Sequence, residues 1–384
     1  MVEQEINGSV ASGYEEVIDA FRRVLRDERE PVDAQVAAYQ DGRRVVDLWT
    51  GPETTADSLL GIYSASKGVT HLIVAMLVQD GVLDLDLPVA TWWPEFAAGG
   101  KDRLLLRELL AHRAGLVGTP RGFTLEELSD DRFVARALEG RVPFWRPGSA
   151  AGYHALVVGA LTGEVVRRAT GRSVQELATD WFTKGLGVDV HLGTTEDQDT
   201  RFLTALPMTD TDERVRAARV AASMPNALAD VAFNRGIRGR TEVWELPNHA
   251  IVRRRGTASL GGLGTARGLA ELYARAAAGV GDKAPFLTPD TCAAFAQIQS
   301  VGPDLVLHTQ KAWAVGFHAV TEQYPALHAG AFGHSGAGGQ QALVDPVQAL
   351  SYAFLRRRGV LPKEADAGHE LLLSAISRAG RTVR

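Results

Sequence analysis

The sequence predicts a mixed α/β fold of the α+β kind, with an antiparallel sheet built from both ends of the chain and a mainly helical domain inserted between them. Strand-like apolar runs occur before residue 50 and again after residue 310, whereas helical spacing and long loops dominate in between. Helices predicted at the two ends of the chain would pack against this sheet. We therefore expect a discontinuous sheet domain, residues 1–63 and 250–384, a helical domain, residues 64–249, and a cleft between the two.

The first 80 residues supply two helices and a hairpin. Residues 14–28 show apolar side chains at helical spacing, and two strands follow, joined by Asp41-Gly42, a dipeptide that favours tight hairpin turns. A strongly apolar segment, residues 72–78, follows Ser64-Ala65-Ser66-Lys67 and closes at Asp80-Gly81. This pattern predicts a buried helix with a glycine just after its last turn.

Local signals in the middle of the chain mark further helices. Residues 124–127 and 173–176 are capping boxes, Thr-x-x-Glu and Ser-x-x-Glu, and residues 288–290 combine an N-cap threonine with a proline at the first helical position. Residues 211–222 are charged and rich in alanine, which predicts an exposed helix. Residues 225–247 read as an irregular segment.

The last 75 residues return to strand patterns. Residues 312–320, 341–344 and 350–355 read as strands, with a turn at Asp345-Pro346 between the last two. A terminal helix is expected over residues 365–379. These strands would pair with those near the N-terminus and complete the sheet.

Ser64 and Lys67 form a Ser-x-x-Lys pattern at the start of the apolar helix. Residues three apart on a helix share a face, so the hydroxyl and the amine would point into the same space. A serine becomes a nucleophile when a neighbouring base takes its proton, and a lysine can be that base if burial lowers its pKa. Lysine is scarce here, with six in 384 residues, so a lysine at this place suggests that a titratable amine is needed.

Two later motifs add candidate site residues. Tyr153 stands in a Pro-Gly-containing loop, residues 147–155, that leads into a helical pattern over residues 156–169; near a lysine ammonium its phenol could have a lowered pKa and act as a base. The alternative is a half-buried core aromatic. Residues 332–339 are rich in glycine, which lets a ligand approach backbone N–H groups that can bind an oxyanion. The alternatives are an ordinary glycine-rich strand entry and, for His334, a structural histidine.

In this order the three motifs resemble the serine β-lactamase and penicillin-recognising family, whose signature is Ser-x-x-Lys, Tyr-x-Asn and then Lys-Thr-Gly or a variant such as His-Ser-Gly. The similarity is greatest to the class C β-lactamase-like branch, which contains family VIII carboxylesterases, DD-peptidases and some acyltransferases. The stretches Leu109–Leu116 and Gly262–Arg267 also resemble family patterns. The resemblance implies a β-lactamase/DD-peptidase-like fold with its active site in the cleft. It also implies an oxyanion hole formed by the N–H groups of Ser64 and Ala337, and a substrate site lined by His334, Ser335 and Gly336.

Two departures from the family pattern bear on the substrate. Ala155 stands where β-lactamases have the asparagine that binds the amide side chain of the β-lactam, and His334 stands where they have a lysine that binds the substrate carboxylate. A neutral imidazole binds an anion less well than a lysine does. Both changes favour small uncharged carboxylic esters, so the resemblance implies a serine carboxylesterase. In it, Ser64 forms an acyl-enzyme and Lys67 and Tyr153 transfer protons.

Other functions remain open. A β-lactamase, a DD-peptidase-like amide hydrolase or an acyltransferase could use the same acyl-enzyme. An α/β-hydrolase with Ser335 as nucleophile is suggested by Gly333-His334-Ser335-Gly336-Ala337, which nearly matches Gly-x-Ser-x-Gly, but that motif must open a helix and here a strand-like run follows. A non-catalytic binding module is the third alternative.

Composition argues against several classes of partner. The net charge is −5 without a basic run, so neither nucleic acid nor an anionic membrane surface is expected as a partner. Cys292 is the one cysteine, and the histidines show no metal-ligand spacing, so we expect neither a disulfide nor a metal or other cofactor. The N-terminus is acidic without an apolar core and no segment is long enough to span a membrane, which predicts a cytoplasmic location. The expected partner is a small-molecule ester; the sequence leaves the oligomeric state open.

Overall fold

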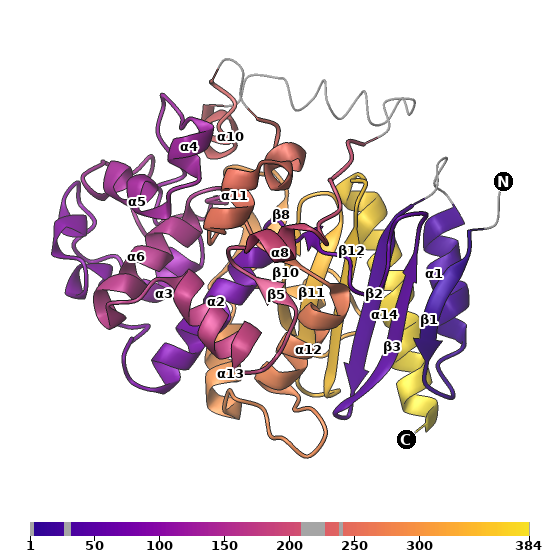
Figure 1. Ribbon diagram of the computed structural model, residues 1–384. Helices are drawn as coiled ribbons and strands as arrows, with labels where there is room; N and C mark the ends of the chain where they lie inside the picture. The colour runs from indigo at the N-terminus through magenta and orange to yellow at the C-terminus, as the bar shows by residue number, and fades with distance from the viewer. Residues whose placement is uncertain (1–3, 27–31, 209–226, 238–240, 384) are drawn as a thin grey trace.

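The computed structural model describes residues 4–26, 32–208, 227–237 and 241–383. Within these residues the central element is a nine-stranded antiparallel sheet with the strand order β1-β3-β2-β12-β11-β10-β9-β8-β7 (Figure 1). Its strands are β1 Ile6–Val10, β2 Ala34–Gln40, β3 Arg43–Thr50, β7 Ser300–Pro303, β8 Gln310–Trp313, β9 His318–Ala319, β10 Phe332–Gly336, β11 Gln340–Asp345 and β12 Leu350–Arg356. The prediction of one antiparallel sheet built from both ends of the chain is therefore confirmed.

The two ends of the chain meet in the middle of this sheet. Strands β2 and β12 pair over seven residues, from Ala34 opposite Arg356 to Gln40 opposite Leu350. Strand β2 continues into β3 through the predicted turn, where Asp41 and Gly42 have φ values of +49° and +75°. Glycine adopts such left-handed conformations freely, which is why this dipeptide suits the turn.

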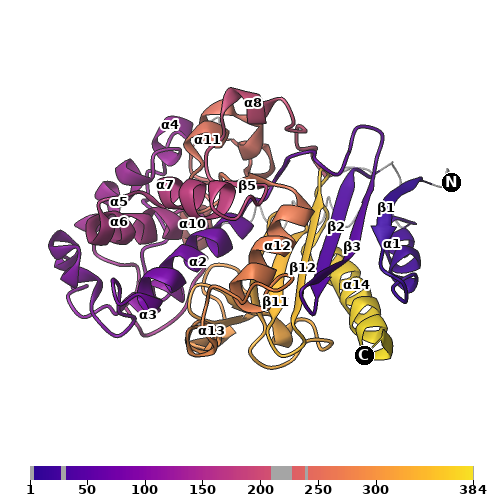
Figure 2. The same ribbon diagram turned by 60° about the horizontal axis from the view of Figure 1, so that its bottom comes forward.

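Helices cover both faces of the sheet. On one face α1 (Glu16–Arg26) and the terminal helix α14 (Pro362–Val383) pack against each other, and both chain ends lie on this side (Figure 1). Helix α1 forms because its apolar residues recur at helical spacing and bury one stripe against the sheet. On the opposite face α12 (Ala266–Ala277) crosses β2, β11 and β12, as Figure 2 shows.

Helix α2 (Ala65–Gln79) carries the Ser-x-x-Lys pattern and contacts both the sheet and the helical part. It touches β10 and β11 on one side and α6, α7 and α13 on others. It is buried nearly all round, as its apolar sequence predicts. The chain leaves the helix at Asp80, and Gly81 follows with a φ of +71°, which confirms the predicted glycine.

Shorter elements make up the rest of the described chain. The remaining α-helices are α3 Leu106–Leu110, α4 Leu125–Leu128, α5 Asp131–Glu139, α6 Val158–Thr170, α7 Val174–Ala178, α8 Glu196–Asp199, α10 Ala227–Ala232, α11 Ala250–Arg255 and α13 Pro289–Ala296. Short 3-10 helices are η1 Val89–Thr91, η2 Pro94–Ala97, η4 Val243–Asn248 and η5 Val320–Glu322, and η3 Thr179–Lys184 is a π-helix. A second sheet has the order β4-β6-β5, with β4 Leu60–Gly61, β6 Leu263–Gly264 and β5 Val190–His191.

The predicted helix starts are confirmed. The hydroxyls of Thr124, Ser173 and Thr288 accept hydrogen bonds from the backbone N–H groups three residues later, and the first two complete capping boxes. None of the helices in the described part of the chain has the length and apolar character needed to cross a membrane.

Some predicted elements differ from those observed. The single strand expected over residues 312–320 is two strands, β8 and β9, separated by a turn in which Gly316 has a φ of +78°. The glycine-rich motif at residues 332–336 is itself a strand, β10. The helix expected at residues 211–222 lies outside the described residues. The larger apolar cluster contains residues of both predicted domains, and the domain boundaries stay a prediction.

Candidate active site

Ser64 lies at the N-terminal end of α2 as its N-cap residue and is partly exposed. The residue before it, Tyr63, is buried and has a φ of +47°, a left-handed conformation that costs a residue with a side chain roughly 1–2 kcal/mol. Its phenol donates a hydrogen bond to the carbonyl of Trp244 at 2.8 Å. Backbone strain of this kind persists where the surrounding structure holds it, and it is common at functional sites.

Lys67 is fully buried, and its amine lies 3.0 Å from the Ser64 hydroxyl. The same nitrogen is 2.7 Å from the carbonyl oxygen of Ala155 and 2.8 Å from that of Ser259. Burial holds the pKa of Lys67 well below its ordinary value, because a charged ammonium loses its hydration there.

The Lys67 nitrogen lies in donor geometry toward three oxygens, the Ser64 hydroxyl and the carbonyls of Ala155 and Ser259. Carbonyl oxygens can only accept, so the two N–H bonds of a neutral amine point to Ala155 and Ser259. The remaining position on the nitrogen is then a lone pair, directed at the Ser64 hydroxyl. In this deprotonated form Lys67 would accept the hydrogen bond from Ser64, and that is the arrangement that general-base activation requires.

Tyr153 lies beside this pair and is 8% exposed. Its ring stacks on Trp313, with the ring centroids 5.3 Å apart and an interplanar angle of 10°, and the Lys67 amine is 5.1 Å from its centroid. Burial raises the pKa of Tyr153, and the charge of Asp304 raises it further, whereas a side-chain hydrogen bond with Ser64 lowers it. The net direction is upward, so the phenol stays protonated.

The expectation that the phenol has a lowered pKa is therefore wrong. It rested on a lysine ammonium near the phenol, and burial instead favours the neutral amine of Lys67. A protonated Tyr153 is suited to donating a proton, whereas Lys67 is suited to accepting one.

The loop that carries Tyr153 is held through its backbone by His112, which lies in the stretch Leu109–Leu116, and by Asp304, which the sequence did not mark. His112 accepts hydrogen bonds from the N–H of Gly152 through its carbonyl, at 3.1 Å, and from the N–H of His154 through Nδ1, at 3.2 Å. The Tyr153 N–H donates to the Asp304 carboxylate at 3.1 Å. A carboxylate so far away in sequence, or a carbonyl such as that of Ser259, carries no local sequence signal.

The third motif forms strand β10, and its side chains alternate between the two faces of the sheet. His334 lies on the face toward α2, where its Cβ is 3.4 Å from the position of a Cβ on Gly68. Alternation along the strand places the Ser335 side chain on the opposite face from His334, and its expected place in the substrate site stays a prediction. Ser335 also lies within a strand followed by another strand, not at a strand-to-helix turn, so the α/β-hydrolase alternative with Ser335 as nucleophile is wrong.

His334 has no exposed surface, whereas Ser335 and Gly336 are partly exposed. Its ring lies 4.4 Å from that of His318 and 6.4 Å from that of Tyr153, measured between centroids. Nδ1 donates to the carbonyl of Ser335 at 2.7 Å, and burial holds the pKa of the imidazole well below its ordinary value. The position that carries a lysine in the family pattern is thus occupied by a neutral ring.

The end of β10 lies close to the segment that leads into α2. A Cβ on Gly336 would be 2.5 Å from the carbonyl oxygen of Ile62, so a side chain cannot be accommodated there without a shift. Ala337 follows directly. The N–H groups of the first three residues of α2 donate to the carbonyls of residues 62–64, which precede the helix. The predicted oxyanion donors, Ser64 and Ala337, thus belong to two segments that are packed together.

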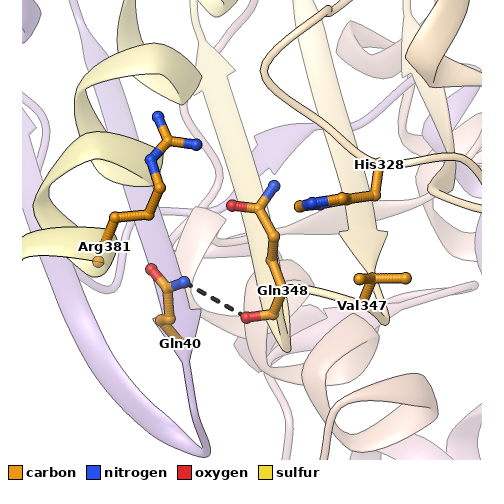
Figure 3. A pocket seen from close by; sticks show the side chains of 6 residues that line it. Gln40, His328, Val347, Gln348 and Arg381 are labelled. Carbon is orange, nitrogen blue, oxygen red and sulfur yellow. Dashed lines mark hydrogen bonds between the residues drawn. The ribbon is translucent and has the colours of Figure 1, made fainter. Parts of the chain in front are cut away.

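A pocket of about 250 Å³ lies elsewhere, at the end of β2 beside the β11–β12 turn and the last turns of α14 (Figure 3). Its lining residues are Gln40, His328, Val347, Gln348, Gly380 and Arg381. It contains none of the residues that the sequence predicts for the site. The described residues hold no group of three or more potential metal ligands, and the expectation of a cofactor-free protein stays a prediction.

A family model described as Beta-lactamase matches residues 20–376. The chain belongs to the beta-lactamase family. It is similar to the Esterase/beta-lactamase LipL of Mycobacterium tuberculosis, with 31% identity over 348 residues that cover 85% of this chain and 77% of that protein.

Solved structures agree with this assignment. The EstA structure from Arthrobacter nitroguajacolicus Rue61a matches with a TM-score of 0.87 and 33% identity, over 97% of this chain and 98% of that chain. A structure described as a family VIII carboxylesterase matches with a TM-score of 0.87 and 27% identity, over 98% and 100% of the two chains. The protein therefore has the β-lactamase/DD-peptidase fold, and its relatives support a serine hydrolase of that fold.

Proposed function

We propose that the protein is a serine carboxylesterase that cleaves small uncharged esters through an acyl-enzyme on Ser64. The observation that carries this proposal is the buried amine of Lys67, 3.0 Å from the Ser64 hydroxyl, with carbonyl acceptors for its two N–H bonds. This arrangement leaves the lone pair of the amine for the serine proton. Among the described residues, no carboxylate forms an ion pair with Lys67 that would favour its charged form.

In the acylation step Ser64 Oγ attacks the ester carbonyl carbon while its proton moves to Lys67 Nζ. The tetrahedral oxyanion would be bound by the N–H groups of Ser64 and Ala337. When the bond to the alcohol breaks, the departing oxygen takes the proton of the Tyr153 phenol, and the Lys67 ammonium returns its proton to Tyr153. Every proton is then restored, and the acyl group remains on Ser64.

Deacylation repeats these steps with water in place of serine. Lys67, neutral again, takes a proton from the attacking water, and the proton returns to Ser64 Oγ as the acid leaves. A general base or acid typically contributes about a hundred- to ten-thousandfold to the rate. Lys67 and Tyr153 are suited to these roles because burial moves their pKa values in opposite directions.

The preference for uncharged esters rests on two positions. Ala155 offers only a methyl group where the family pattern has an amide, and its carbonyl is already occupied by Lys67. His334 is neutral and buried, so it supplies no cation for a substrate carboxylate. The printed descriptions of LipL, as an esterase/beta-lactamase, and of the family VIII carboxylesterase support ester cleavage.

A β-lactamase is the second candidate. The printed name of LipL combines esterase and beta-lactamase, and the same serine and lysine could open a β-lactam ring. We expect this activity to be slow relative to ester hydrolysis, because one hydrogen bond to a charged group contributes roughly 1.5–3 kcal/mol of affinity.

Labelling tests the assignment of the nucleophile. A fluorophosphonate should modify Ser64, which is found by mass spectrometry of the digested protein, and Ser64→Ala should abolish turnover of p-nitrophenyl butyrate. Ser335→Ala is the matched control and should keep clear activity, since Ser335 points to the other face of the sheet. Labelling of Ser335 in place of Ser64 would overturn the mechanism.

A further inference from the structure

Asp304 is a buried carboxylate that the proposed mechanism does not use. It follows β7 directly and is 2% exposed. Its Oδ1 accepts three backbone hydrogen bonds, from Val306 at 2.8 Å, Leu307 at 2.9 Å and Tyr153 at 3.1 Å. Its Oδ2 accepts a fourth, from the indole Nε1–H of Trp313 at 3.0 Å. All four donors are neutral.

Two of these bonds have a local explanation. An aspartate at the start of a turn commonly accepts from the N–H groups two and three residues later, as Asp304 does with Val306 and Leu307. The other two bonds reach Tyr153, 151 positions away, and Trp313 on the next strand. The turn alone would need neither of them.

We propose that Asp304 is a positioning residue that fixes Tyr153 for proton transfer. One oxygen holds the Tyr153 backbone, and the other holds the indole on which the Tyr153 ring stacks at a centroid distance of 5.3 Å. Tyr153 is thus restrained both at its backbone and on one face of its ring. Fixed orientation of a proton donor contributes strongly to rate, and a displacement of about 1 Å can cost about a hundredfold.

The same loop links Asp304 to the base. Two residues after Tyr153, the carbonyl of Ala155 accepts from the Lys67 amine at 2.7 Å. A carboxylate suits this position because both of its oxygens are acceptors, whereas an asparagine amide has only one. The negative charge of Asp304 also acts with burial to raise the pKa of Tyr153, which keeps the phenol protonated.

The inference rests on the proposed esterase function, and substrates with different leaving groups separate the two. p-Nitrophenolate departs without a proton, whereas the ethoxide of ethyl butyrate needs one from Tyr153. In Asp304→Asn, kcat/KM for ethyl butyrate should therefore fall at least about tenfold further than kcat/KM for p-nitrophenyl butyrate. A role confined to folding would lower both values by the same factor.

A second substitution tests the direction of the hydrogen bonds. In Asp304→Asn the amide oxygen can keep the three backbone donors, but its NH₂ group then faces the Trp313 N–H. Adding Trp313→Phe removes that conflict and keeps an aromatic ring beneath Tyr153. The double variant should regain part of the ethyl butyrate activity that Asp304→Asn loses.

Asp345→Asn is the matched control. Asp345 is fully buried and accepts backbone hydrogen bonds from His328 at 2.8 Å, Val347 at 3.0 Å and Gln348 at 3.2 Å. These three partners line the remote pocket of Figure 3. Asp345→Asn should lower the unfolding midpoint without changing the ratio of kcat/KM for ethyl butyrate to kcat/KM for p-nitrophenyl butyrate.

Three outcomes would decide the matter. A wild-type protein that hydrolyses neither ester would overturn the proposed function itself. An active wild type whose ester ratio is unchanged in Asp304→Asn would overturn only the positioning role. If Asp304→Asn fails to fold, Trp313→Phe alone provides the test. It removes the hydrogen bond from the Trp313 indole to Asp304, so kcat/KM for ethyl butyrate should again fall further than kcat/KM for p-nitrophenyl butyrate. A wild-type ratio of the two kcat/KM values in Trp313→Phe would refute the inference.

Discussion

Replacing Lys67 with methionine should change the way in which the stability of the protein depends on pH. Burial holds the pKa of Lys67 well below its ordinary value of 10.5 in the folded state, while the unfolded chain restores the ordinary value. Between these two values the unfolded state binds one more proton than the folded state. The wild type therefore gains stability as pH rises, until the pH reaches about 10.5.

The magnitude follows from the single proton. One proton contributes about 1.4 kcal/mol per pH unit to the free energy of unfolding, so the wild type should gain stability over Lys67→Met with at most this slope wherever the pH lies between the folded and unfolded pKa values of Lys67. Methionine leaves the carbonyls of Ala155 and Ser259 without a donor, which costs about 1–3 kcal/mol for each. That cost does not depend on pH. The test is therefore how the difference in unfolding free energy between the wild type and Lys67→Met changes with pH, and not how large the difference is at any one pH.

Urea unfolding of both proteins at pH 7, 8 and 9, followed by tryptophan fluorescence, measures this slope. Lys184→Met is the control, because it removes a lysine side chain that is 71% exposed. A difference between wild type and Lys67→Met that stays constant from pH 7 to pH 9 would refute the argument, because Lys67 would then be charged in the folded protein.

Three further results are expected. Lys67→Arg should be nearly as damaging as Lys67→Ala, with kcat lowered about a hundred- to ten-thousandfold, because arginine cannot accept the serine proton; wild-type turnover in the arginine variant would contradict this. The kcat/KM for p-nitrophenyl butyrate should exceed that for nitrocefin, and the reverse order would restore β-lactamase as the first candidate. Gly336→Ala should cost about 1–3 kcal/mol of stability and much of the activity, because the added Cβ would lie 2.5 Å from the Ile62 carbonyl oxygen. Gly140→Ala is the control: the space around Gly140 is open, so this variant should keep the wild-type melting temperature and ester hydrolysis.

The features of the fold that could be predicted from the sequence are those set by local patterns. The hairpin at Asp41-Gly42, the capped helix starts and the apolar helix α2 each depend on residues within one or two turns of chain. Their pairing into one sheet followed from the placement of strands at both ends. Strands β8 and β9 were merged in the prediction because Gly316 was read as part of one run, whereas its φ of +78° turns the chain there.

The surroundings of the site could not be predicted in the same way. The partners of the Lys67 amine are two backbone carbonyls, and any residue type could supply them. Asp304 reads in sequence as an ordinary turn residue, since its bonds to Tyr153 and Trp313 depend on tertiary contacts. The error in the pKa of Tyr153 has the same origin: the proximity of the motifs suggested a charged lysine, whereas burial lowers the pKa of Lys67 and raises that of Tyr153.

Burial and catalytic power are linked in helix α2. An apolar helix that packs on several sides is what the core of the protein needs, and the same packing removes water from Lys67. Two carbonyl dipoles satisfy the N–H bonds of the amine without the full negative charge that would restore its ordinary pKa. A carboxylate in place of either carbonyl would stabilise the ammonium and remove the base. In the proposed mechanism, the burial that lowers the pKa of Lys67 costs the fold some stability at neutral pH and supplies the basicity that Ser64 would require.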